Sequence, residues 1–283
     1  MTWLQKLGVG LAFTLALGLM FYPWLSNAYH DHQTDNQIEL LKHSPQTNQK
    51  EADSIRDMQA YNERLASGHA RLTDPFERSA TSDDATYEQL GNMTDTGVMG
   101  YVSIPAISVN LPIYHGTSDA VLEKGVGHLQ GTSLPIGGAS THSVLTGHTG
   151  LSQAKLFTDL SALKPKDVFY LHVMGKDLAY QVTRIDVVLP NQLDKLQIVP
   201  QKDLCTLVTC TPYGVNSHRL LVTGRRIAYR KAKASPVKKR MGQSRWMASY
   251  RLSLLVALGV FGLFLLAYYV KVRLRERSDA YYW

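Results

Sequence analysis

Apolar and polar residues alternate in three different ways along the chain, and the longest region has the pattern of short strands. Between residues 97 and 228, β-branched runs are separated by Gly, Pro, Asn and Asp, at a spacing typical of an all-β barrel or sandwich. The runs cover residues 100–114, 141–148, 167–175, 178–190, 204–210 and 219–227. Only 152–163 and 118–125 have the apolar spacing of helices. Because about 130 residues can bury one core, we predict a single all-β domain here.

The segment before the strands has a different pattern and is predicted to be partly helical. Residues 51–66 carry apolar residues at helical spacing with charges between them, and Gly68 follows as a stop signal. Residues 29–50 are polar and contain a proline, which we interpret as a stalk. Residues 70–90 form an acid-rich, Pro-containing loop that is long for a plain connector. We expect this loop to have a function of its own.

Two long apolar runs flank everything else. Residues 7–25 and 252–270 each span 19 residues without a charged side chain. At about 1.5 Å per residue, such a helix matches the roughly 30 Å hydrocarbon core of a bilayer. The first run is either a cleaved signal peptide or an uncleaved anchor. The second ends in tyrosines followed by basic residues, so we predict a transmembrane helix with a cytoplasmic tail.

The net charge of +7 is a local property of one segment. Residues 225–251 contain ten Lys and Arg and no acid, so the remaining chain is net negative. A basic segment beside a membrane helix favours contact with anionic lipid or wall polymer over nucleic acid, although a solvated linker is the alternative. We therefore predict six segments in chain order. They are an anchor (1–28), a stalk with helix and loop (29–96), the β-domain (97–228), a basic linker (229–251), a transmembrane helix (252–270) and a cytoplasmic tail (271–283).

The two cysteines differ in their predicted surroundings. Cys205 and Cys210 are five positions apart in one predicted strand, so they lie on opposite faces and about 16 Å apart, too far for a disulfide. Cys205 lies inside the strand and is expected to be buried and inert. Cys210 ends the strand before a Pro-Tyr-Gly turn, where a thiol can be presented at a barrel rim. We therefore take Cys210 as a candidate nucleophile.

A nucleophilic thiol needs a proton acceptor and a group that stabilises the oxyanion. His148 ends the run 141–148 and has glycine before it, although His115 and His128 occupy comparable loops. Arg219 follows the turn after Cys210, so in an antiparallel pair it would lie beside the strand that carries the cysteine. Its fixed charge suits a developing oxyanion. His218 is the competing residue on the other face.

These residues carry a resemblance to a known family. The segments TLVTCTPYGVNSHRLLVTGRR and GHLQGTSLPIGGASTHSVLTGHTGL are similar to those of sortases, and closely to the class C, pilus-assembling sortases. The resemblance implies a closed β-barrel of about eight strands with short helices. It also implies that Cys210, His148 and Arg219 form the catalytic set. Their sequence neighbours Thr209 and Thr149 are candidate substrate-binding residues.

The resemblance also gives the acid-rich loop a function. Class C sortases have a lid with an Asp-Pro-aromatic motif over the active site, matched here by Asp74, Pro75 and Phe76. We expect Asp74 to pair with Arg219 and Phe76 to cover the sulfur of Cys210. Many relatives carry Trp in place of Phe76.

The activity that the resemblance implies is that of a membrane-anchored cysteine transpeptidase with its catalytic domain outside a Gram-positive-type cell. The enzyme would cleave an LPXTG-like sorting signal between Thr and Gly and join the acyl group to a pilin lysine. Such acyl exchange needs neither a metal nor a cofactor, and no nucleic acid is expected as a partner. Two alternatives remain, namely a wall-anchoring sortase that uses a peptidoglycan-precursor amine and a non-catalytic wall-binding membrane protein.

Overall fold

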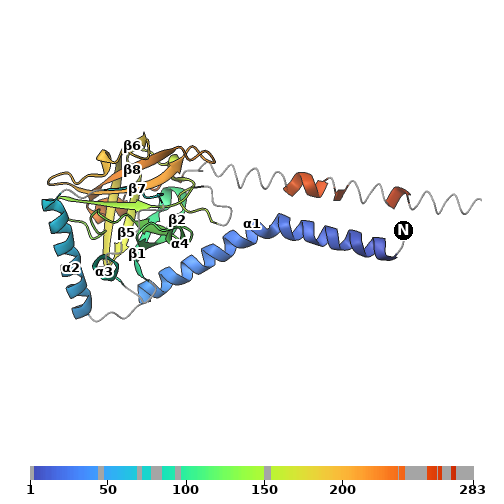
Figure 1. Cartoon of the computed structure of the whole chain (residues 1–283), viewed down its shortest axis with the longest axis horizontal. Coiled ribbons are helices and arrows are strands. Elements are labelled where there is room, and N and C mark those ends of the chain that lie inside the picture. Colours follow the sequence, from blue (N-terminus) through green and yellow to red (C-terminus); the bar gives the residue numbers. More distant parts are fainter. Residues whose placement is uncertain are drawn as a thin grey trace, which may run out of the picture. The chain divides into compact units, whose positions relative to one another are not determined.

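The computed structural model describes residues 3–43, 48–68, 72–77, 85–92, 97–149, 154–234, 236–239, 254–259, 261–262 and 269–271 (Figure 1). The chain divides into two compact units. One comprises Met1–Met20 and Gln243–Trp283, and the other comprises Phe21–Gly242. The strands of the described chain belong to the second unit, which carries the candidate site.

The strands of the second unit close into one barrel. Their bounds are β1 Val98–Ile104, β2 Val109–His115, β3 Val126–His128, β4 Thr141–Thr146, β5 Val168–Val173, β6 Lys176–Val188, β7 Asp203–Thr211 and β8 His218–Ile227. Around the barrel the order is β1-β2-β3-β4-β7-β8-β6-β5. The pairs β2–β3 and β4–β7 are parallel. The predicted closed, all-β barrel is therefore confirmed.

The barrel is filled by the inward-facing residues of these strands. Phe169 and Tyr180 stack at a centroid distance of 5.6 Å in the main core, and Leu207 and Val222 are fully buried there. A Cβ on Gly224 would lie 2.6 Å from the ring of Phe169, so this position has no room for a larger residue. Burial of these side chains supplies the main driving force for closing the barrel.

Helical segments precede the barrel and connect its strands. The α-helices are α1 Trp3–His43, α2 Asn48–Ser67, α3 Ala85–Gln89, α4 Asp119–Leu122 and α5 Tyr229–Ala234. The 3₁₀ helices are η1 Pro105–Ile107, η2 Leu160–Ala162 and η3 Asp194–Leu196. The predicted helices at 51–66 and 118–125 are confirmed as α2 and α4.

Helix α2 packs onto the barrel within the second unit, and so does the end of α1. Met58 of α2 is fully buried in the main core. Asn62 accepts a hydrogen bond from the backbone of Leu134 at 2.7 Å and donates one to its carbonyl at 3.1 Å. At the end of α1, Gln37 accepts a hydrogen bond from Tyr114 at 2.6 Å, and Leu41 packs on the same tyrosine. The segment before the lid is thus attached to the barrel at both helices.

The structure differs in local detail from what the sequence pattern indicated. Within the predicted stalk 29–50, residues 29–43 continue α1, which the polar pattern did not predict. Residues 154–163 form turns and the short η2 instead of a helix, because their apolar residues fill the core from a loop. Strand β3 was not predicted, since three residues carry too little pattern. The predicted linker 229–251 begins with helix α5, while 235 and 240–251 lie outside the described residues.

The predicted membrane helices remain predictions. Residues 7–25 form part of α1, whereas within 252–270 only 254–259, 261–262 and 269–270 are described. In the part of the chain that the structure describes, no helix meets the length and apolarity needed to cross a bilayer.

Four neighbouring strands of the barrel share an outward-facing surface, which we call the outer face. The register pairs Thr146, Val144 and His142 of β4 with Val208, Thr206 and Leu204 of β7. The same face continues from β7 to β8 and from β8 to β6, where Arg219, Leu221 and Thr223 pair with Val188, Asp186 and Arg184.

A second apolar cluster lies on this face, made of Leu129, Val144, Val188, Leu196, Val208 and Leu221. Other segments of the chain therefore pack on the outer face, and these segments surround the candidate site.

Candidate active site

The thiol and the arginine lie next to each other because β7 and β8 form a hairpin. Cys210 of β7 pairs directly with Arg219 of β8. Between them, the carbonyl of Pro212 accepts hydrogen bonds from the backbone of Val215 at 3.1 Å and of Asn216 at 2.9 Å. The expected placement of Arg219 beside the strand that carries the cysteine is confirmed. Both cysteines are free, Cys205 being buried and Cys210 half-buried.

The end of β4 brings His148 to the same edge of the outer face. Gly147 donates a backbone hydrogen bond to Val208 at 3.0 Å and accepts one from the hydroxyl of Thr209 at 2.7 Å. The carbonyl of His148 accepts a hydrogen bond from Phe157 at 3.0 Å. A Cβ on Gly147 would lie 2.8 Å from the Phe157 ring in the core, so position 147 faces inward and His148 faces outward.

Residues 72–77 lie over this edge, and we call them the lid. The carboxylate of Asp74 accepts two hydrogen bonds from Arg219, from Nε at 2.8 Å and from Nη2 at 2.5 Å. Both side chains are nearly buried, with 12% and 10% of their surface exposed. A bidentate, charge-assisted pair of this kind is among the stronger polar interactions in proteins. The expected pairing of Asp74 with Arg219 is confirmed.

Phe76 lies between the histidine and the arginine. Its ring centroid is 5.6 Å from that of His148, and the guanidinium carbon of Arg219 lies 4.9 Å from the ring centre. Leu72 and Phe76 also pack on the apolar cluster of the outer face. The lid thus occupies the space between two predicted catalytic residues, while the expected cover of the Cys210 sulfur by Phe76 stays a prediction.

Burial shifts the pKa values of the two reactive side chains. Burial raises the pKa of the Cys210 thiol, the charge of Arg219 lowers it, and the carboxylate of Asp74 raises it further, with a net increase. Burial lowers the pKa of His148, although Asp119 and Glu123 oppose this shift. Both shifts disfavour the ionised form of the side chain. The surroundings in the closed structure therefore favour the neutral thiol and the neutral imidazole.

The remaining site predictions have mixed outcomes. Thr209 is buried and its hydroxyl is used by Gly147, which gives it a place in holding β4 against β7. Thr149 is half-buried after His148, and no hydrogen bond in the described chain links it to Cys210 or Arg219. Substrate contact by these two threonines stays a prediction. Pro75 lies in the turn in which Glu77 donates to the carbonyl of Asp74 at 3.0 Å.

Sequence reasoning missed the carbonyl oxygens that hold the arginine. Arg219 Nη1 donates to the carbonyls of Asn216 at 3.0 Å and His218 at 3.2 Å. Asn216 has a left-handed backbone, with φ of 57°, which turns its carbonyl toward the guanidinium. An Asn following the Pro-Tyr-Gly turn is the signal that could have indicated this bend. His218, the competing candidate, hydrogen-bonds to Ser217 instead of pairing with Asp74.

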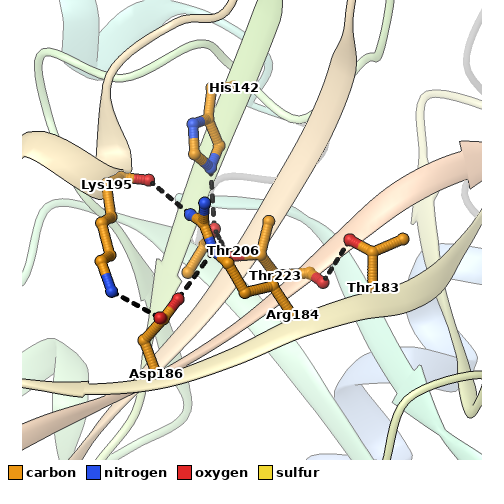
Figure 2. Close-up of polar contacts among 7 residues, drawn as sticks. All are labelled: His142, Thr183, Arg184, Asp186, Lys195, Thr206 and Thr223. Carbon is orange, nitrogen blue, oxygen red and sulfur yellow. Dashed lines mark hydrogen bonds and ion pairs between the residues drawn. The ribbon is translucent and has the colours of Figure 1, made fainter.

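Farther along the outer face, the covering is polar (Figure 2). His142 bonds the hydroxyl of Thr206 at 2.7 Å and the carbonyl of Gln197 at 2.8 Å, which fastens the β6–β7 connection to the barrel. Thr206 and Thr223 share a hydrogen bond of 2.9 Å beside it. Burial lowers the pKa of His142 to about 4. This layer covers the far end of the face, while the lid covers the edge at which Arg219 and His148 lie.

Within the described residues, no group of three His, Cys, Asp or Glu side chains is placed to hold a metal ion. The arrangement supports acyl transfer through a thiol, with an imidazole for proton transfer and a guanidinium for the oxyanion.

Comparisons with known proteins agree with this chemistry. A sortase domain matches residues 102–227. Sortase C-1 from Actinomyces oris is 50% identical, with 63% of this chain and 99% of that chain covered and a TM-score of 0.60. Streptococcus pneumoniae sortase C is 42% identical, with coverage of 69% and 97% and a TM-score of 0.64. A curated relative, sortase A of Bacillus anthracis, is 32% identical over 45% of this chain and 59% of its own length.

The matched region contains the barrel, Cys210, His148 and Arg219, and the sortase C structures extend the likeness beyond the barrel. The chain belongs to the sortase family of cysteine transpeptidases, and the solved structures that it resembles are those of class C sortases.

Proposed function

We propose that the protein is a membrane-anchored class C sortase that joins surface proteins into covalent pili. It cleaves an LPXTG-like sorting signal between Thr and Gly and transfers the acyl group to a pilin lysine. Cys210 acts as the nucleophile, His148 transfers protons and Arg219 stabilises the oxyanion.

The reaction takes place in two acyl transfers. The Cys210 thiolate attacks the Thr carbonyl, and Arg219 donates hydrogen bonds to the oxyanion. As that intermediate collapses, protonated His148 gives its proton to the departing glycine amine and a thioester remains on Cys210. A lysine amine then attacks the thioester while His148 accepts its proton. The products are an isopeptide bond and the free thiol.

The lid's grip on Arg219 is the single observation that carries this proposal. A carboxylate with both oxygens on one guanidinium occupies the position where a developing oxyanion needs donors. Phe76 fills the space between His148 and the same arginine. Residues 72–77 thus occupy the site as a substrate would, and opening of the lid precedes catalysis.

The choice of a pilin as substrate rests on similarity. Among the similar structures, one is described as a pilus-related sortase C of Group B Streptococcus, and the study of the pneumococcal enzyme refers to pilin substrate specificity. The apolar runs 7–25 and 252–270 support membrane tethering, with the catalytic domain on the outer face of a Gram-positive-type envelope. Tethering raises the effective concentration of substrates held in the same membrane. The basic stretch 225–251 would rest on anionic lipid or wall polymer.

The second candidate is attachment to the cell wall through a peptidoglycan-precursor amine. Curated relatives called sortase A, such as that of Streptococcus agalactiae at 27% identity, keep this candidate open. The Asp74 lid favours the pilus reaction, because the class C resemblance includes it.

The test uses purified full-length protein, an LPXTG peptide and two competing amines, a lysine-containing peptide and triglycine. We expect mass spectrometry to show the LPXT acyl group on the lysine side chain, and no product with Cys210→Ala. Transfer of the acyl group mainly to triglycine would contradict the pilus reaction and support attachment to the cell wall. Transfer to neither amine, with Cys210 unmodified, would overturn both.

A further inference from the structure

One buried hydroxyl on the outer face has no hydrogen-bond partner. Thr146 is 0% exposed, and none of the described residues offers its Oγ1 a donor or acceptor. Most buried polar atoms in proteins are hydrogen-bonded, because an unpaired one keeps the full cost of losing water. A hydroxyl in such a position needs a physical reason.

Thr146 lies on the same face of the barrel as the predicted catalytic residues, away from the barrel core. Position 147 faces the core, since its Cβ would meet Phe157, and side chains alternate along a strand. Thr146 therefore faces outward with His148. In the parallel ladder Thr146 pairs with Val208, which lies two positions before Cys210 on the same face of β7. Thr146 thus lies on the neighbouring strand, one two-residue step, about 7 Å along the strand direction, before the level of Cys210.

The lid packs next to this position. Val208 belongs to the apolar cluster on which Leu72 and Phe76 pack, and Phe76 also contacts His148. These lid residues present apolar side chains, which cannot satisfy a hydroxyl. The closed state leaves the Thr146 hydroxyl buried and unpaired at a cost, and an opened lid would give water or a bound peptide access to this part of the face.

We propose that the Thr146 hydroxyl binds the peptide backbone of the sorting signal, as a donor to the carbonyl about two residues upstream of the attacked Thr carbonyl. This inference rests on the proposed function. An extended peptide repeats its backbone groups every 7 Å or so, which matches the step from Cys210 to Thr146. The acyl part of the peptide lies on the Thr146 side because the strand end beyond Cys210 must stay open for the second amine.

The same hydroxyl sets how firmly the lid closes. In the lid-closed state it is unpaired, and in the peptide-bound state it is paired, so it favours exchange of the lid for substrate. Its presence lowers the stability of the closed protein and raises the affinity for the peptide. These two effects have opposite signs, and a purely structural hydroxyl cannot produce both.

The test compares Thr146→Val, which removes only the hydroxyl at nearly constant shape, with Thr146→Ser, which keeps it. Ser143→Ala is the matched control. Ser143 is also buried with an unpartnered hydroxyl on β4, but it pairs with Cys205 on the core-facing side. We measure kcat/KM with an LPXTG peptide and a lysine-containing acceptor, the Tm of each protein, and the rate at which a small thiol reagent labels Cys210.

We expect Thr146→Val to lower kcat/KM about tenfold, mainly through KM, and to slow labelling up to about tenfold because the lid closes more firmly. Its Tm should rise, as should that of Ser143→Ala, whereas only Thr146→Val should lose kcat/KM. Thr146→Ser should recover most of the rate. Equal kcat/KM for wild type and Thr146→Val, or a Tm that falls together with the rate, would overturn the inference. A failure of the proposed function appears separately, as wild-type protein without turnover, and the Tm and labelling results still decide the effect of the hydroxyl on the lid.

Discussion

Asp74 and Arg219 lie 145 positions apart in sequence and form a two-point contact, with N···O distances of 2.8 and 2.5 Å. The contact joins the lid to the strand next to Cys210. Because both charges are nearly buried, neither is fully satisfied unless the other is present. The lid is therefore held by the group that the reaction requires, and substrate must compete with Asp74 for Arg219.

Removal of the Asp74 carboxylate should make Cys210 more reactive. Asp74→Ala leaves Arg219 without its lid partner, so the open state becomes more populated. It also removes a charge that raises the pKa of the thiol. We expect Cys210 to be labelled at least about tenfold faster at neutral pH, measured by mass spectrometry over time. The pH at which labelling reaches half its maximum rate should move downward, since a lower pKa gives more thiolate at a given pH.

Asp177→Ala is a matched control for this change. Asp177 also forms an ion pair, with His172 at 2.6 Å, but on the β5–β6 hairpin away from the lid. Its loss should leave labelling within about twofold of wild type, as expected for an exposed pair. Equal labelling of wild type and Asp74→Ala would show that the ion pair does not hold the lid.

The size of the aromatic residue at position 76 should set the rate at which Cys210 is labelled. Phe76→Ala removes the ring that lies between His148 and Arg219, so labelling should become several-fold faster. Phe76→Trp offers the guanidinium a larger π face and should slow labelling below the wild-type rate. Faster labelling in the Trp variant would mean that the space between the two residues is too small for an indole.

The all-β domain and the pairing of Cys210 with Arg219 could be predicted because they follow from local patterns, whereas closure into a barrel was implied only by the resemblance to sortases. Alternating β-branched runs identify strands, and one tight turn between two such runs fixes a hairpin in which residues near the turn meet. The Asp74 contact could be expected only through the resemblance to class C sortases. Its two residues are too far apart in sequence for periodicity to connect them.

Other features could not be predicted because they depend on tertiary contacts. Polar residues 29–43 continue α1, and the contact of Gln37 with Tyr114 helps to hold them to the barrel. Strand β3 has only three residues and is defined by its neighbours on both sides. The apolar residues of 154–163 resemble one face of a helix, yet they enter the core from turns. The unpaired hydroxyl of Thr146 has no signature in the sequence.

A methyl group at Gly147 should displace His148. The added Cβ would lie 2.8 Å from the ring of Phe157, which is fully buried and cannot move away without disturbing the core. We expect Gly147→Ala to cost about 1–3 kcal/mol of unfolding free energy. The shift of the neighbouring histidine should lower kcat at least about tenfold. Denaturant unfolding and steady-state kinetics measure the two effects, and a stable variant with normal kcat would contradict the packing argument.

Acid should destabilise the fold through His142. Burial lowers its pKa to about 4 from 6.5, so the unfolded chain takes up a proton at a higher pH than the folded chain does. The stability that His142 contributes is complete above pH 6.5 and is lost as the pH falls toward 4. His142→Gln should flatten the fall in Tm between these pH values, even if its Tm at pH 7 is lower. An unchanged slope would mean that other groups cause the acid sensitivity.

The central claim is that Cys210 carries the acyl group, and trapping of the intermediate tests it most directly. Purified full-length protein is incubated with an LPXTG peptide without an added amine, quenched in acid and mapped by mass spectrometry, beside Asp74→Ala and Cys210→Ala. We expect a thioester of the LPXT fragment on Cys210, more of it in Asp74→Ala, and none in Cys210→Ala. An acyl group on another residue, or no adduct even when the lid contact is removed, would contradict the claim.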